Sequence, residues 1–209
     1  MFSLSSFAAG ALTWSAAEYC IHRFIGHGPK RVRPVKLLDQ LTPSGIAAAF
    51  NDEHLGHHAD PMYFAPTSHK VLASAVVIGV SGVLTSAVLG PRRGVSFALG
   101  LGLAYAGYEV IHRRIHTHAG VGRYGRWLRR HHLYHHHKTP RSNHGVTTAL
   151  WDVVAGTLET LPRGEPLRIP RKHAPKWALD EQGEIAERYA KDYVLVGSPK
   201  RPERAQPQA

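Results

Sequence analysis

Histidine dominates the chemistry that this chain can perform, since 16 of its 209 residues are histidines. Six of them lie within residues 129–145, RRHHLYHHHKTPRSNHG. Histidine is a common metal ligand, and a chain of this size does not need so many for packing. Taken alone, this stretch could equally be a solvated basic loop. A metal site therefore requires matching groups elsewhere in the chain.

Two histidine triplets share one spacing, in NDEHLGHHADP and again in the stretch above. They are His54, His57 and His58, and then His132, His135 and His136. Residues at i, i+3 and i+4 lie on one face of a helix, so each triplet suits chelation of one or two ions. Repetition of the triplet argues against scattered surface histidines.

Two histidine pairs alternate with the triplets. In YEVIHRRIH, His112 and His116 are one helical turn apart on one face. In EYCIHRFIGHG, His22 and His27 are five residues apart, which on a continuous α-helix turns them about 140° from one another. We therefore expect the helix to end between these two histidines, which Gly26 and Gly28 permit.

About ten imidazoles without thiolate ligands suit iron, copper or zinc better than calcium or magnesium. The one cysteine, Cys20, excludes an intramolecular disulfide. Ten ligands exceed the needs of one ion and suit two metals with about five ligands each. His131, His137 and His144 are surplus to the pattern, although His144 could be a ligand or a hydrogen-bond donor to a ligand, and His131 could replace His132. Carboxylates that could orient imidazoles are Glu18, Asp52, Glu53, Glu109 and Asp152.

The histidines are expected at or beyond the ends of apolar segments, which must position them. Residues 71–89 carry no charge over a length of roughly 28 Å, close to the hydrocarbon thickness of a bilayer. After the short polar turn 90–94, a second apolar run, 95–108, leads into His112. These runs predict a transmembrane helical hairpin, the alternative being a buried hairpin in a soluble helical protein. His69, near the start of the first run, is expected at the membrane interface, and His118 lies off the face of His112.

Residues 2–17 are also apolar and predict an N-terminal membrane helix that carries Glu18 and His22 on its last turns. A signal peptide is the alternative, but the basic region that precedes such a segment is missing. Lys and Arg number six in 22–70 and eighteen in 112–209, against Arg92 and Arg93 in the turn. The positive-inside rule therefore predicts that the histidine-rich segments are cytoplasmic, with the turn and the N-terminus outside.

The remaining segments are expected to complete a cytoplasmic cap. Residues 31–40 should lie along the membrane surface, 120–130 should form a polar connection and 145–162 a helix packed on the site. A proline-rich loop over 162–175 and one short amphipathic helix over 180–196 follow. We thus predict an all-α membrane domain over 1–196, with a dimetal centre in its cap, and a disordered tail over 197–209. The net charge of +11 suits an anionic membrane surface, and we expect no nucleic-acid partner.

Four segments together resemble a known family. They are EYCIHRFIGH, HLGHHADPMYFAP, GYEVIHRRIH and RRHHLYHHHKTPRSNHGVTTALWD. They are similar, in order and spacing, to the four histidine boxes of the membrane fatty acid hydroxylase superfamily. That superfamily includes sterol desaturases and is related to bacterial carotenoid hydroxylases. The resemblance covers residues 18–158 and is closest to the fatty acid 2-hydroxylases that act on sphingolipid acyl chains.

The resemblance implies a non-haem di-iron monooxygenase that hydroxylates an unactivated C–H bond of a fatty acyl chain or acyl lipid, using O₂. The iron ligands that it implies are His22, His27, His54, His57, His58, His112, His116, His132, His135 and His136. It also implies a lipid substrate that enters from the bilayer. The chain shows no motif of a fused cytochrome b5 domain, so two electrons are expected from a separate carrier such as cytochrome b5 or ferredoxin. The family usually has a further membrane helix before the first box, and an aromatic residue is common where this chain has His144.

Two other functions remain open on the sequence. A carotenoid or sterol hydroxylase or desaturase would use the same metal centre, so the histidine boxes hardly distinguish such an enzyme from an acyl hydroxylase. A non-enzymatic membrane metal-binding or transport protein belongs to another class. It would be expected to hold ionisable ligands within its spans, whereas residues 71–89 contain none.

Overall fold

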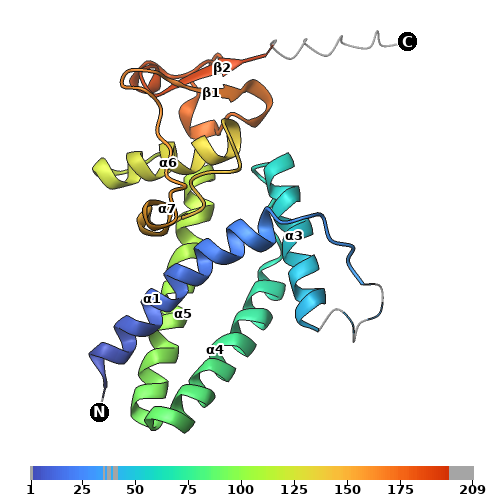
Figure 1. Cartoon of the computed structure of the whole chain (residues 1–209). Helices are drawn as coiled ribbons and strands as arrows, with labels where there is room; N and C mark the ends of the chain where they lie inside the picture. The colour runs from blue at the N-terminus through green and yellow to red at the C-terminus, as the bar shows by residue number, and fades with distance from the viewer. Residues whose placement is uncertain (1, 35, 37–38, 40–41, 198–209) are drawn as a thin grey trace.

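The computed structural model describes residues 2–34, 36, 39 and 42–197, and these are mostly helical (Figure 1). The helices are α1 (Leu4–Cys20), a π-helix η1 (Ile21–Gly26) that continues it, α3 (Pro43–Ala59), α4 (Thr67–Leu89), α5 (Pro91–Thr117), α6 (Gly122–His137) and α7 (Leu150–Val154). The C-terminal segment holds the strands β1 (Leu167–Pro170) and β2 (Tyr193–Val196) and the short 3₁₀ helices η2 (Arg171–His173), η3 (Lys176–Ala178) and η4 (Glu187–Tyr189).

The predicted helical hairpin is present as α4 and α5. Both helices are long and apolar enough to cross a membrane. Gly90 alone joins them, with φ at 86°, because Pro91 already begins α5. Only 6% of the apolar part of α4 is buried, and valine and leucine side chains cover its exposed surface. An apolar face of this size is typical of a helix surrounded by lipid.

Small residues on two faces of α5 set its distances to both neighbours. Towards α4, Ala98 lies opposite Gly82, where an added Cβ would come within 3.0 Å of its Cβ. Towards α1, a Cβ on Gly100 would lie 2.0 Å from the Phe7 carbonyl oxygen, and one on Gly10 would lie 2.1 Å from the Phe97 carbonyl oxygen. Helices in lipid associate through such close backbone packing, since apolar side chains gain nothing there from leaving water.

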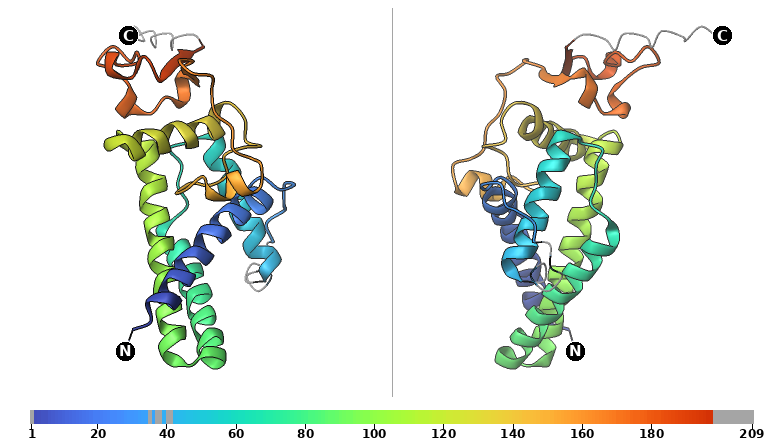
Figure 2. Two further views of the ribbon diagram at one scale, coloured as in Figure 1. Left: turned by 60° about the vertical axis from the view of Figure 1, so that its left-hand side comes forward. Right: turned by 90° about the vertical axis from the view of Figure 1, so that its right-hand side faces the viewer.

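The histidine-bearing helices gather at one end of this bundle. In Figures 1 and 2 the N-terminus lies at the same end as the Gly90 turn, while α3 and α6 lie towards the opposite end. The strands β1 and β2 lie beyond α6 (Figure 2). The arrangement agrees with the expectation that all boxes meet at one end of the hairpin.

The predicted amphipathic helix over 180–196 is wrong. The run YVLV forms β2, which pairs in parallel with β1 in the register Leu167↔Tyr193, because β-branched and aromatic residues suit a half-buried strand. Leu167, Ile169 and Tyr193 pack against Leu133 and Tyr134 of α6. The chain is therefore mostly rather than entirely helical.

Two other expectations need correction, and three lie wholly or partly outside the described residues. The connection expected over 120–130 is the first half of α6, and of residues 145–162 only the five residues of α7 are helical. Gly156, with φ at 66°, follows that helix closely. The surface segment 31–40 is described only in part, the side chain of His69 lies outside the described parts, and so does the tail beyond residue 197.

Gly100→Leu should lower the free energy of unfolding by about 2 kcal/mol or more, because its side chain would collide with the backbone of α1. Gly79→Leu is the matched control, since a Cβ on Gly79 meets no atom within 4 Å. Unfolding in mixed micelles by added denaturing detergent measures the difference. Equal stability of the two variants would contradict the packing of α1 on α5.

Candidate metal centre

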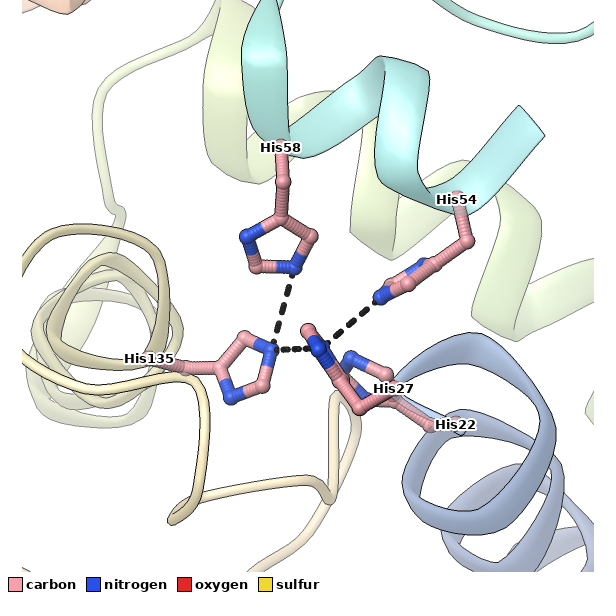
Figure 3. Close-up of side chains that lie close together, drawn as sticks. All are labelled: His22, His27, His54, His58 and His135. Carbon is pink, nitrogen blue, oxygen red and sulfur yellow. Dashed lines mark hydrogen bonds between the residues drawn. The ribbon is translucent and has the colours of Figure 1, made fainter. Parts of the chain in front are cut away.

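The ten predicted ligands form two groups of five, and in each group the ligand atoms lie within 4.8 Å of one another. Site A comprises His22, His27, His54, His58 and His135, as Figure 3 shows. Site B comprises His57, His112, His116, His132 and His136. Both predicted pairs and both predicted triplets are therefore brought together at one end of the bundle.

Each triplet contributes to both sites. On α3, His54 and His58 belong to site A and His57 to site B. On α6 the division is reversed, with His135 in site A and the other two in site B. The i, i+4 pair of each helix points into one site, and the i+3 residue points into the other. The sequence left one or two ions per triplet open, and the structure divides the side chains of each triplet between the two groups.

The first pair is aligned by the π-helix that ends at Gly26. The His27 backbone N–H donates to the His22 carbonyl at 3.0 Å, an i to i+5 bond that widens the turn. The two rings then lie 5.1 Å apart in site A. The helix ends at Gly26, between His22 and His27, as expected, but its last turn is a π-helix, and this wider turn brings residues five apart onto one face.

Asn51 and Gly26 support this turn, and both were missed as site residues. Asn51 is fully buried, and its Nδ2 donates to the carbonyls of Ile25 at 2.8 Å and of Gly26 at 3.1 Å. A Cβ on Gly26 would lie 2.8 Å from Cδ2 of His54, so only glycine allows that imidazole to approach. One signal was available, since Asn51 precedes His54 by three residues on the same face of α3.

Backbone carbonyls orient three of the imidazoles through their far nitrogens. Nδ1 of His22 donates to the His144 carbonyl at 2.5 Å. Nδ1 of His57 donates to the Tyr63 carbonyl at 2.8 Å, and Nδ1 of His135 donates to the Ser142 carbonyl at 2.6 Å. A neutral ring that donates from Nδ1 keeps a lone pair on Nε2. These Nε2 atoms are therefore available as ligands.

The imidazoles are neutral at physiological pH. Burial lowers the pKa of His58 to about 2 and the pKa values of His27 and His57 to about 4. Burial also holds the pKa values of His132, His135 and His136 well below their usual range. Neutral imidazole is the form that binds a metal ion.

The spacing of the Nε2 atoms fits a bound cation. In site A, Nε2 of His27 lies 2.8 Å from Nε2 of His135 and 2.9 Å from Nε2 of His54. In site B, Nε2 of His116 lies 3.1 Å from Nε2 of both His57 and His132. Two nitrogens bound at right angles to one ion, each roughly 2.1 Å away, are about 3.0 Å apart.

Unsatisfied nitrogens support the same interpretation. Nε2 of His22 in site A and Nε2 of His112 in site B are buried without a hydrogen-bond partner among the described residues. An orphaned buried nitrogen is costly, and a bound ion would satisfy it. The donor set therefore fits two metal ions of the kind that prefer imidazole.

Two of the candidate carboxylates, Glu18 and Asp152, bind backbone N–H groups instead of the metal-site imidazoles. Glu18 accepts the N–H groups of Val146 at 2.8 Å and Thr147 at 2.7 Å. Asp152 accepts the N–H groups of His144 and Gly145, both at 2.8 Å. They thereby hold the loop whose His144 carbonyl orients His22. Glu109 pairs with Lys70 at 2.5 Å, and Asp52 is exposed.

The surplus histidines lie outside the two groups of five. Nε2 of His131 lies 3.0 Å from the Gly145 carbonyl oxygen and 3.6 Å from the Asp152 carboxylate. The ring of His137 stacks on that of His173 with centroids 6.1 Å apart. His144 packs edge-on against His22, with centroids 5.5 Å apart. His137 and His144 contact histidines of the sites, but the ring of none of the three surplus histidines belongs to either group.

Trp177 and Arg129 cap the end of α5 that carries two ligands of site B. Trp177 Nε1 donates to the Ile115 carbonyl at 3.1 Å, and Arg129 donates to the carbonyls of Arg114 at 2.9 Å and His118 at 2.6 Å. The last carbonyls of a helix have no partner within the helix, so these donors supply one. The Arg129 charge also favours a helix C-terminus. This cap joins segments far apart in sequence, and no local pattern indicates it.

Trp177→Phe should lower the free energy of unfolding by about 1 kcal/mol, because it removes the indole donor and leaves the Ile115 carbonyl unpaired. Trp127→Phe is the matched control, since Trp127 lies partly exposed on α6. Denaturation of both variants, followed by circular dichroism, measures the difference. A loss as large in Trp127→Phe would contradict a specific role for the cap.

Comparisons with known proteins agree with this site. The profile of the family described as Fatty acid hydroxylase matches residues 7–157, which include all ten histidines of sites A and B. Fatty acid 2-hydroxylase of Rattus norvegicus is 30% identical over 160 residues, which cover 73% of this chain and 39% of that protein. Dihydroceramide fatty acyl 2-hydroxylase FAH1 of Arabidopsis thaliana is 28% identical over 163 residues, 78% of this chain and 62% of that protein.

A solved structure is also similar. It is described as full-length scs7p with only the hydroxylase domain visible, and it matches with a TM-score of 0.55 and 30% identity, over 78% of this chain and 58% of that one. The chain thus spans less than two thirds of the length of these relatives. The match extends over most of the helical bundle and all of the histidine boxes. On these grounds the chain belongs to the fatty acid hydroxylase family.

Proposed function

We propose that this chain is a membrane-bound di-iron monooxygenase that hydroxylates an unactivated C–H bond of a fatty acyl chain or acyl lipid. The two interleaved sites of five neutral imidazoles each carry the proposal. Family membership supports the reaction, and the printed names of the relatives, fatty acid and dihydroceramide fatty acyl 2-hydroxylases, support an acyl substrate.

Sites A and B would each hold one iron ion. When bound, the iron pair would supply the means to reduce O₂ with two electrons from a separate carrier, such as cytochrome b5 or ferredoxin, and two protons from water, so that one oxygen atom enters the C–H bond and the other leaves as water. The carbonyls of Ser142, Tyr63 and His144 keep the Nδ1 protons in place, so that Nε2 of each ring faces the ion.

Aromatic side chains would guide an acyl chain and exclude water. Phe64 packs on His57, with ring centroids 5.3 Å apart, and Arg113 lies 4.5 Å over the ring of Phe64. On the side of the apolar helices, Tyr108 stacks on His112 at 5.7 Å and Trp14 packs edge-on against Tyr108 at 5.5 Å. We infer that the acyl chain reaches site B from the bilayer along this second side.

The proposed topology has α1, α4 and α5 in the membrane and both sites at the cytoplasmic face, in one domain over 1–196. The N-terminus and the Gly90 turn would be outside, since both lie at the opposite end from α3 and α6 (Figure 1). The excess of Lys and Arg on the histidine-bearing segments supports this orientation and contact with an anionic membrane surface.

Purified protein should contain about two irons per chain. A substitution in one triplet and a substitution in the other should weaken binding of the same ion when both residues belong to the same site. His54→Ala and His135→Ala should weaken binding of the ion in site A, although the two residues lie on different helices. His57→Ala and His136→Ala should weaken binding of the ion in site B. Metal analysis and Mössbauer spectroscopy after reconstitution with iron measure occupancy and coordination.

His118→Ala is the control for these variants, because its side chain contacts Thr117 and belongs to neither site. It should retain both irons. A single zinc per chain after careful reconstitution would overturn the di-iron proposal. Loss of one and the same ion from His135→Ala and His136→Ala would overturn the assignment of ligands to sites.

Deletion of the gene in its native cell should abolish hydroxylated acyl chains, and the intact gene should restore them. His135→Ala should insert into the membrane normally and fail to restore the product, because it removes a ligand of site A. Lipid profiling by mass spectrometry measures both. Loss of hydroxylated carotenoids or sterols, with acyl chains unchanged, would contradict the proposed substrate.

A further inference from the structure

The short helix α7 exposes large apolar side chains. Leu150, Val153 and Val154 are 47%, 60% and 68% exposed. The rest of the helix faces inwards, with Asp152 fully buried and Trp151 half-buried. A contiguous apolar surface rarely faces water on a folded chain, so we expect another molecule to cover this one.

The contacts of α7 place it beside the apolar part of α1. Trp151 Nε1 donates to Oγ of Ser15, which lies one turn before Glu18 within α1. Just after α7, Oγ1 of Thr157 lies 2.9 Å from the Tyr19 hydroxyl. Figures 1 and 2 show α7 next to the end of α1 that leads into the sites. If α1 lies in the membrane, α7 lies at the level where the bilayer surface meets it.

The surroundings of α7 suit the headgroup region of a bilayer. Asp152, the one carboxylate within residues 144–158, is fully buried, so that no acidic side chain of this segment faces lipid phosphates. Arg23 donates to the Tyr19 hydroxyl, which contacts Thr157 just after α7. Tyr124 is 54% exposed beside the exposed Arg123, and its hydroxyl donates to the carbonyl of Thr147, just before α7. Tyrosine and arginine around an apolar surface are typical of a membrane interface.

We propose that α7 is an interfacial anchor, with Leu150, Val153 and Val154 inserted at the boundary of headgroups and acyl chains and with Arg23 and Arg123 directed to lipid phosphates. The proposal rests on the membrane position of α1 given under the proposed function. Through Asp152, α7 also holds the N–H groups of His144 and Gly145. The anchor would thus fix the height above the bilayer of the loop that orients His22.

Spin labels in lipid nanodiscs test the anchor directly. In a Cys20→Ser background, which removes the one native thiol, Val153→Cys carries the label on α7. Val83→Cys, 69% exposed on α4, is the control for lipid contact, and Glu181→Cys, exposed in the C-terminal segment, is the control for water contact. Collision rates with O₂, which concentrates in lipid, and with a water-soluble nickel chelate are measured for each label.

The ratio of O₂ to nickel collisions at residue 153 should exceed the ratio at residue 181 several-fold. It should be closer to the ratio at residue 83 than to the ratio at residue 181. Val154→Cys is a second label for the same face, should Val153→Cys fail to fold. A ratio at both α7 positions equal to that at residue 181 would overturn the anchor. Protection of both positions from both reagents would also overturn it, since another protein or a second copy would then cover α7.

These collision rates need neither iron nor substrate. Failure to find iron or a hydroxylated product would overturn the proposed function and leave a lipid-like ratio at α7 intact. A water-like ratio at residue 83 would instead show that the hairpin is not in the membrane, and that result would overturn the proposed topology together with the anchor.

Discussion

Convergence of uncharged ring nitrogens on two small volumes is the constraint on which the structure depends. Neighbouring Nε2 atoms lie between 2.8 and 3.2 Å apart in both sites. Burial keeps the pKa of His58 near 2, so protonation does not relieve the crowding of lone pairs at neutral pH. A cation at the centre of each group would be coordinated by these lone pairs and would offset their mutual repulsion. The buried polar groups around the sites serve to maintain that geometry.

The division of both triplets makes the two sites mechanically interdependent. Because α3 and α6 each supply ligands to site A and to site B, a shift of either helix changes both. The orienting groups are mainly backbone carbonyls, and the buried carboxylates Glu18 and Asp152 secure the loop that presents the His144 carbonyl. A carboxylate that binds backbone N–H groups positions a whole loop, whereas one bound to a ring positions one ligand only.

The apolar helices and the C-terminal segment hold these ligands from opposite ends. Close packing of α1 on α5 at Gly10 and Gly100 fixes the approach of His22 to the rest of site A. At the other end, the indole of Trp177 and the guanidinium of Arg129 satisfy the last carbonyls of α5, next to His116. Residues beyond the 7–157 match to the family profile therefore contribute to the same end of the bundle.

Local patterns determined what could be predicted from the sequence alone. The ten histidines of sites A and B and the helices α3, α4 and α5 follow from spacings of a few residues and from runs without charge, which act within one turn or one helix. The π-turn at His22, the division into sites A and B, the parallel pair β1–β2 and the roles of Asn51 and Trp177 depend on contacts between distant segments. Those contacts are decided by which faces pack together in the tertiary structure, and the sequence within any one helix does not specify its partner.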